Sequence, residues 1–215
     1  MNISLRHYQS EAISKTIESF ERGLTRQLLT LPTGSGKTII MAALAKQLGK
    51  RTLLLAHREE LITQAIAKFK LIWPESEIGV CMAEQNEPDK EVVFGSVQSC
   101  SRDAKLNQLK GNDFNLLLID EAHHANSPSY LKVIESLGFG GKDPSKSDCL
   151  VLDFADEGHN LETIASLGRT IPEAQYAGEA SETEKKEKRP FQFKSKGFVM
   201  RNLTSWEQLA SFGYP

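Results

Sequence analysis

The sequence predicts an α/β protein in which a mainly parallel β-sheet is flanked by helices. Short apolar runs alternate with amphipathic helical patterns as far as residue 137, and turn residues separate the two. The apolar runs are continuous, as in strands that are buried on both faces of a parallel sheet. With 215 residues, 40% of them hydrophobic, the chain can form one domain, expected over 1–154, and an irregular tail over 155–215.

The first predicted helix covers 7–21, where apolar residues recur at helical spacing before Gly23. The same spacing predicts helices over 38–48 and 61–73. A weaker helical pattern lies between residues 94 and 116. The apolar runs that predict strands are 27–31, 52–56, 78–82, 92–94 and 116–119.

The character of the chain changes after the last of these helical patterns. Gly138–Asp148 is rich in Gly, Ser, Pro and charge and predicts a loop. Cys149–Phe154 predicts one more apolar strand, which we expect to pair within the sheet. Glu179–Arg189 is almost all charged or small and predicts a solvated linker. Thr204–Glu207 fits a capping box that opens a short last helix.

Composition excludes several classes of function. The formal net charge of −2 gives no chain-wide basic field for nucleic acid, so any such binding must be local. Cys81, Cys100 and Cys149 form no CxxC pair, which indicates a reducing compartment without a disulfide framework or zinc site. No apolar run approaches the ~20 residues that span a bilayer. We therefore expect no membrane association and a cytoplasmic or other intracellular location.

A candidate phosphate-binding loop follows the first predicted strand. Gly34 and Gly36 allow backbone N–H groups to curl around anionic oxygens at the start of the next helix. Lys37 adds a mobile charge for the phosphates, and Thr38 offers a hydroxyl to magnesium. The alternative is an ordinary Gly-rich turn, since Leu31 stands where the strict motif has its first glycine. The predicted nucleotide-binding residues of this loop are Thr33, Gly34, Ser35, Gly36, Lys37 and Thr38.

Two acidic residues follow the predicted strand 116–119. Asp120, at the end of a buried strand, can reach a magnesium ion that the nucleotide holds. Glu121 beside it can orient or deprotonate an attacking water molecule. The alternative is a helix N-terminus with acidic residues, which is a common arrangement.

Taken together, Leu31–Thr38 and Asp120–His123 resemble the first RecA-like domain of superfamily-two helicases and translocases. They are most similar to the DEAD/DEAH-box branch that includes the type III restriction subunit. The resemblance covers about residues 3–137 and implies a RecA-like P-loop NTPase lobe that uses ATP and Mg²⁺. It implies that Lys37, Asp120 and Glu121 are catalytic and that Thr38 and Asp120 hold the metal. It also implies weak binding of nucleic acid, with DNA favoured over RNA.

Three further segments match family motifs in order. Leu5–Gln9 resembles the adenine-reading segment, in which Gln9 would hydrogen-bond the base and Arg6 or Tyr8 would flank it. Leu55–Leu61 and Gly95–Ser99 resemble segments that contact the nucleic-acid backbone. The alternative is that these polar groups are ordinary surface charges or strand-end residues. The implied nucleic-acid contacts are His57, Arg58, Ser96 and Gln98.

The chain departs from the family after the acidic motif. Cys149–Asp156 stands where the family has a strand ending in Thr-Ala-Thr or a variant, which couples two RecA-like halves. No arginine-bearing motif of a second lobe is found, unless the ending has diverged. The resemblance therefore implies an incomplete DNA or RNA helicase or ATPase, poorly active alone, whose second lobe a separate chain could supply. The alternatives are a non-catalytic, nucleotide-gated binding or regulatory fragment and an inert remnant.

Overall fold

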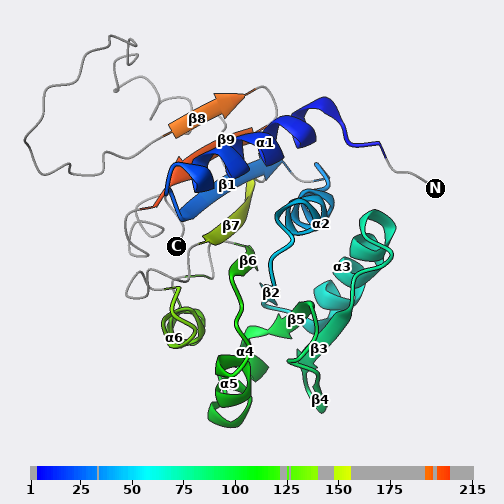
Figure 1. Ribbon diagram of the computed structural model, residues 1–215, viewed down its shortest axis with the longest axis vertical. Helices are drawn as coiled ribbons and strands as arrows, with labels where there is room; N and C mark the ends of the chain where they lie inside the picture. Colours follow the sequence, from blue (N-terminus) through cyan, green and yellow to red (C-terminus); the bar gives the residue numbers. More distant parts are fainter. Residues whose placement is uncertain are drawn as a thin grey trace, which may run out of the picture.

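One mostly parallel sheet forms the centre of the protein (Figure 1). The computed structural model describes residues 4–32, 34–121, 125, 127–139, 148–155, 192–195 and 198–203. Within these residues the strand order is β4-β3-β5-β2-β6-β7-β1-β9-β8. The strands are β1 (Arg26–Pro32), β2 (Thr52–Ala56), β3 (Ile78–Met82), β4 (Gln85–Asn86), β5 (Val92–Ser96), β6 (Leu116–Asp120), β7 (Asp148–Ala155), β8 (Gln192–Ser195) and β9 (Phe198–Asn202).

Helices cover both faces of this sheet. The described helices are α1 (His7–Glu21), α2 (Lys37–Leu48), α3 (Glu59–Ile72), α4 (Val97–Cys100), α5 (Asp103–Lys110) and α6 (Pro128–Ser136). Side chains of α1, α2 and α3 share one hydrophobic layer with the sheet, and side chains of α4, α5 and α6 share the other. The fold class predicted from the sequence is therefore confirmed, including the mainly parallel sheet between layers of helices.

The strand sequences explain why both faces are apolar. Successive side chains of a strand point to opposite faces, so a continuous apolar run supplies both layers at once. In β2, Leu54 belongs to the layer of α1–α3, whereas Leu53 and Leu55 belong to the layer of α4–α6. In β6, Leu118 and Ile119 divide in the same way.

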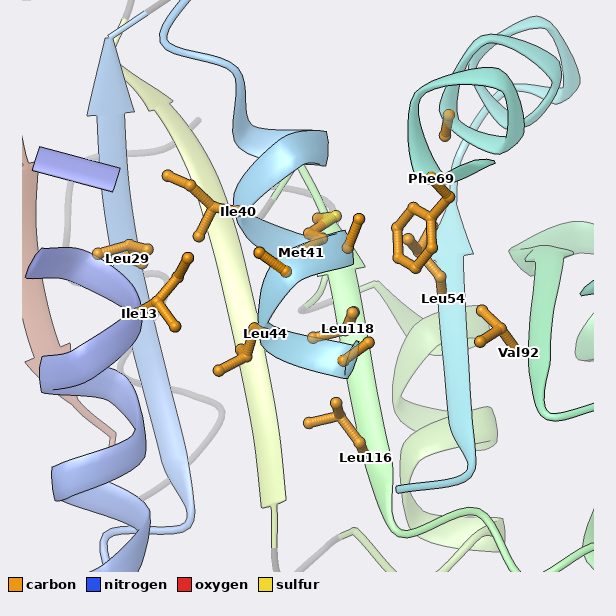
Figure 2. Packing of buried hydrophobic residues seen from close by; sticks show 14 of the residues in the cluster. Ile13, Leu29, Ile40, Met41, Leu44, Leu54, Phe69, Val92, Leu116 and Leu118 are labelled. Atoms are coloured by element: carbon orange, nitrogen blue, oxygen red, sulfur yellow. The ribbon is translucent and has the colours of Figure 1, made fainter. Parts of the chain in front are cut away.

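Figure 2 shows the larger layer, in which α2 lies along the sheet between α1 and α3. Ile13 of α1, Ile40 of α2 and Leu29 of β1 belong to this layer. At the other end, Phe69 of α3 packs edge-on against Phe94 of β5, with ring centroids 4.9 Å apart. Such edge-to-face pairs add about 0.5–1.5 kcal/mol to the burial of the rings. Buried side chains thus hold α2 against the sheet, and with it the loop that joins β1 to α2.

Most predicted elements are confirmed, with shifts of a few residues at their ends. The helix predicted over 7–21 has those bounds, and the strand predicted over 27–31 extends by one residue at each end. The weak pattern after residue 94 resolves into two short helices, α4 and α5. The predicted linker Glu179–Arg189 and the capping box Thr204–Glu207 lie outside the described residues.

The strand predicted over Cys149–Phe154 pairs within the sheet, as expected. It lies inside the sheet, because β7 is parallel to β6 on one side and to β1 on the other. Without β7 the sheet would lose the contact between its two halves, because among the described strands β6 and β1 are joined only through this strand. Strand β7 therefore lies between β1, which is followed by the loop at Gly34, and β6, which ends in Asp120.

The sheet also continues beyond β1, where the sequence predicts only an irregular tail. Strand β9 runs antiparallel to β1, and β8 runs antiparallel to β9. Phe198 and Met200 of β9 join the hydrophobic layer of α1, and the N–H of Leu203 donates to the carbonyl oxygen of Arg26. These residues were missed because β9 mixes Phe, Val and Met with Arg201 and Asn202, and so resembles neither strand pattern.

Candidate functional site

The candidate residues gather at one edge of the sheet. The parallel strands β1, β2, β5 and β6 all end at this edge, so the segments that follow them are neighbours there. The edge carries the loop after β1, His57 after β2, the α4 segment after β5 and Asp120 at the end of β6. Ligands of open α/β sheets bind at such carboxyl ends.

The loop between β1 and α2 has the backbone of a phosphate-binding turn. Gly34 and Gly36 take left-handed conformations with φ of 74° and 78°, which other residues adopt only with strain. The N–H of Ser35 donates to the Pro32 carbonyl oxygen at 3.2 Å and closes the turn. Gly36 then directly precedes the first turn of α2, where helix N–H groups point at an anion. Thr33 lies outside the described residues.

The N-terminal segment holds this loop by two hydrogen bonds to one carbonyl. Tyr8 Oη donates to the Ser35 carbonyl oxygen at 2.7 Å, and Gln9 Nε2 donates to the same oxygen at 2.8 Å. Arg6 Nη1 in turn donates to Tyr8 Oη at 3.4 Å. The segment predicted to read adenine is therefore brought to the loop, and Arg6 reaches the loop through Tyr8.

The Gln9 side chain is committed to these contacts. Its Oε1 accepts a 2.9 Å hydrogen bond from the N–H of Arg6, and the residue is 5% exposed. An amide group has two N–H donors and two acceptor lone pairs, so one of each is left for a base. The predicted role of Gln9 on adenine stays a prediction, whereas its role in fixing the Ser35 carbonyl is a finding.

Lys37 and Asp120 form the charged centre of the site. Lys37, the first residue of α2, is 6% exposed, and Thr38 beside it is half-buried. Burial raises the pKa of Asp120, the Lys37 ammonium lowers it, and the charge of Glu121 raises it again. Because the influence of Lys37 requires proximity, the fold brings the loop and the acidic strand end together, although β7 separates β1 from β6.

Glu121 departs from the strand in an unusual conformation. Its φ is +62°, a left-handed value that is uncommon for residues other than glycine, and its N–H donates to Asp120 Oδ1 at 3.2 Å. Such outliers cluster at functional sites, where the surroundings maintain them. Ala122–His124, the remainder of the acidic motif, lie outside the described residues.

The predicted nucleic-acid contacts are only partly brought together. Gln98 Nε2 lies 3.3 Å from His57 Nδ1, which joins the segments after β5 and β2. Arg58 is exposed at the start of α3. Ser96 is 1% exposed, and its Oγ accepts a hydrogen bond from the Ser99 N–H as the N-cap of α4. Ser96 thus caps the helix that contains Gln98. This contact agrees with the alternative interpretation, in which Ser96 is a polar residue at the end of a strand.

Tyr130 of α6 was not predicted as a site residue, and it lies within electrostatic range of the two acids. Burial raises the pKa of Tyr130, and the charges of Glu121 and Asp120 raise it further. No motif singles out this residue, and its only sequence signal is an aromatic residue early in the helix that follows the acidic motif.

The described residues contain no cluster of three or more His, Cys, Asp or Glu side chains that could hold a metal by itself. Magnesium commonly binds through one or two protein groups together with nucleotide phosphates. None of the helices in the described part of the chain has the length and apolar character to cross a membrane.

A parallel sheet with a glycine loop at a helix N-terminus, a buried lysine at the start of that helix and an acid at the end of another strand defines the class of RecA-like nucleotide-binding lobes. Residues 2–154 match the family model described as "Type III restriction enzyme, res subunit". The chain belongs to this family, which confirms the resemblance drawn from its motifs.

Relatives with known names agree with this assignment. The chain is 35% identical over 143 residues to IRC3 of Saccharomyces cerevisiae, which is named an ATP-dependent helicase. It is 34% identical over 143 residues to the Schizosaccharomyces pombe irc3, named a mitochondrial ATP-dependent helicase. These matches cover 61% and 63% of this chain but only 20% and 23% of the relatives. The chain therefore spans about a fifth of the length of these curated relatives.

Two solved structures share the fold. The Sulfolobus solfataricus SWI2/SNF2 ATPase core in complex with dsDNA matches with a TM-score of 0.55 and 16% identity, over 72% of this chain and 32% of that chain. The type ISP restriction-modification enzyme LlaBIII bound to DNA matches with a TM-score of 0.51 and 15% identity, over 70% of this chain and 13% of the other. At these identities the likeness shows the fold alone.

Proposed function

We propose that this chain binds Mg-ATP at the carboxyl edge of the sheet as the nucleotide-binding lobe of a nucleic-acid-dependent ATPase or helicase. One observation carries the proposal: Lys37 at the start of α2 lies within electrostatic range of Asp120 at the end of β6 and lowers the pKa of its carboxyl group. Lys37 would supply the cation for phosphate, and Asp120 would supply the acid for magnesium. Within the family, ATP-dependent helicases are relatives of this chain, which supports the choice of nucleotide.

The residues present fit the proposed ligand. The buried Ser35 Oγ has no hydrogen-bond partner among the described residues, as expected of a polar group that a ligand satisfies. In the proposed complex Lys37 would contact phosphate oxygens, and Thr38 and Asp120 would hold magnesium. When bound, magnesium neutralises charge on the phosphates. Glu121 would orient the attacking water and accept its proton.

We further propose that nucleic acid, with DNA favoured over RNA, binds weakly beside the nucleotide through His57, Arg58 and Gln98. Their place on the same sheet edge supports this, and the two structural neighbours are themselves DNA complexes. A separate chain that supplies a second RecA-like lobe would be the partner that completes a helicase.

A non-catalytic, nucleotide-gated module is the second candidate. Strand β7 occupies the position next to the acidic strand, yet its sequence lacks the Thr-Ala-Thr ending that couples two lobes in the family. This candidate and the first share the Mg-ATP site and differ only in turnover.

The test is a calorimetric titration of Mg-ATP into the wild-type chain and into Lys37→Ala. Loss of a charge-assisted contact should weaken affinity on the order of 10–100-fold. Lys46→Ala is the matched control, because Lys46 lies on the same helix but is exposed and pairs with Glu75. Equal affinities of the wild type and Lys37→Ala would refute the proposed site. Single-turnover hydrolysis then separates the two candidate functions.

A further inference from the structure

Tyr130 carries a hydroxyl that packing does not require. The residue lies on α6, is 0% exposed, and shares its hydrophobic layer with Val133 and Ile134. Its Oη is buried and has no hydrogen-bond partner among the described residues. Burying a polar group without a partner costs free energy, and a phenylalanine would fill the same space without that cost.

Two observations place this hydroxyl beside the acids of the site. The layer that encloses Tyr130 contains Ile119, the residue before Asp120, and Ala125, which lies just after the acidic motif. Independently, the charges of Glu121 and Asp120 both raise the pKa of Tyr130 beyond the effect of burial, which places the phenol within electrostatic range of both carboxylates. The phenol is therefore a neutral donor close to two acceptors.

Glu121 is the acid whose direction matters most in the proposed site, because it would orient the attacking water. Its left-handed backbone, with φ of +62°, turns it out of the line of β6. Its N–H donates to Asp120 Oδ1, which holds the backbone at the end of the strand. A carboxylate that orients water acts well only when its position is restrained by neighbouring side chains.

We infer that Tyr130 is a positioning residue, whose hydroxyl donates a hydrogen bond to the Glu121 carboxylate in the Mg-ATP complex and fixes its direction toward the attacking water. The inference rests on the proposed function. Tyr130 also shares its hydrophobic layer with Val97 and Cys100 of α4, the helix that presents Gln98.

The first test compares the wild type with Tyr130→Phe in the full chain. Affinity for Mg-ATP should stay within about twofold, because the hydroxyl does not touch the nucleotide. The single-turnover rate of hydrolysis should fall roughly 10- to 100-fold, as expected for a lost hydrogen bond to a charged group. Thermal stability should not fall, since no hydrogen bond within the described residues is removed.

Thr30→Val is the matched control, because Thr30 also carries a buried hydroxyl without a partner among the described residues. This control should hydrolyse ATP at the wild-type rate. An unchanged hydrolysis rate in Tyr130→Phe would overturn the inference. So would a combined loss of rate, affinity and stability, which would indicate a purely structural role.

A second measurement decides the question when hydrolysis is too slow to compare. Fluorine NMR of the full chain labelled with fluorotyrosine gives a Tyr130 signal, assigned by its absence from Tyr130→Phe. Added Mg-ATP should shift this signal in the wild type and leave it in place in Glu121→Ala. A wild type that binds Mg-ATP with an unmoved Tyr130 signal overturns this inference alone. A wild type that binds no Mg-ATP in calorimetry contradicts the proposed function, and the inference with it.

Discussion

Gly36 has no side chain at the point where a Cβ atom would lie 2.7 Å from Nε2 of Gln9. The same Nε2 donates to the Ser35 carbonyl oxygen at 2.8 Å, so the Gln9 amide lies directly against the loop. The conformation of the loop and the position of α1 therefore depend on each other. A substitution of Gly36 or Gln9 should therefore change both the affinity for nucleotide and the free energy of unfolding.

Gly36→Ala should destabilise the chain and weaken Mg-ATP binding. The left-handed φ of 78° alone costs about 1–3 kcal/mol for a residue with a side chain, and the new methyl group must also displace Gln9. Chemical denaturation and calorimetry measure the two effects. Gly23→Ala separates them, because Gly23 has the same φ of 78° but no atom within 4 Å of its would-be Cβ. Equal losses of stability and affinity in the two variants would contradict the contact.

Asp120→Asn should raise the stability of the metal-free chain at neutral pH. Burial raises the pKa of Asp120 in the folded state above its ordinary value, even though Lys37 opposes the shift. The unfolded chain then releases this proton at lower pH than the folded chain, so stability falls as pH rises from the ordinary pKa, about 3.9, to the folded value. The asparagine avoids this loss because it cannot ionise.

Thermal unfolding in the presence of a chelator at several pH values measures this difference. The advantage of Asp120→Asn should be largest above the folded-state pKa of Asp120 and should shrink as pH falls toward the ordinary value. With Mg-ATP added, the order should reverse, because the proposed metal site would stabilise only the wild type. A metal-free Asp120→Asn chain that is less stable than the wild type at pH 7 would contradict the argument.

Arg58→Ala should weaken binding of single-stranded DNA and flatten its dependence on salt. Loss of one phosphate contact should reduce the slope of log affinity against log salt by about 0.7. Fluorescence anisotropy over a salt series measures that slope. Arg22→Ala is the control, because Arg22 is exposed after α1, just before β1 begins at the opposite edge of the sheet. An Arg58→Ala chain with an unchanged slope would place the nucleic-acid surface elsewhere.

Hydrolysis by this chain alone should respond little to nucleic acid. Its sequence has no segment that resembles the arginine-bearing motif, and an arginine finger contributes about 10³–10⁵ in rate to phosphoryl transfer. We expect slow single-turnover hydrolysis, with stimulation by DNA well below about a hundredfold. Stimulation above that level would show that another chain or a second copy provides the missing group, and dilution of the protein would distinguish the two.

Backbone amides of β7 should exchange with solvent as slowly as those of β2. Strand β7 pairs in parallel register with both β6 and β1, so its opening requires separation of the sheet. Hydrogen exchange followed by mass spectrometry compares it with β4, a two-residue strand at the end of the sheet. Peptides from β7 that exchange as fast as those from β4 would exclude the central position.

The chain's local patterns were enough to predict much of the fold. Helix α1 and strand β2 follow directly from their spacing of apolar residues, and the glycines of the loop mark its left-handed turns. Strand β9 was not predictable in this way, because its pairing with β1 depends on a partner far away in the sequence. Its apolar side chains become core residues only when α1 is already in place.

The sequence by itself determined which chemistry is available at the site: an ammonium at Lys37, carboxylates at Asp120 and Glu121, and glycines where the loop must turn. These are fixed by residue type and by position relative to a strand end. Only the tertiary structure decided that Gln9 and Tyr8 hold the Ser35 carbonyl, that Ser96 caps a helix, and that Tyr130 lies within electrostatic range of the acids. Such contacts join segments from different elements, and the packing of side chains between layers selects them, whereas local propensity does not.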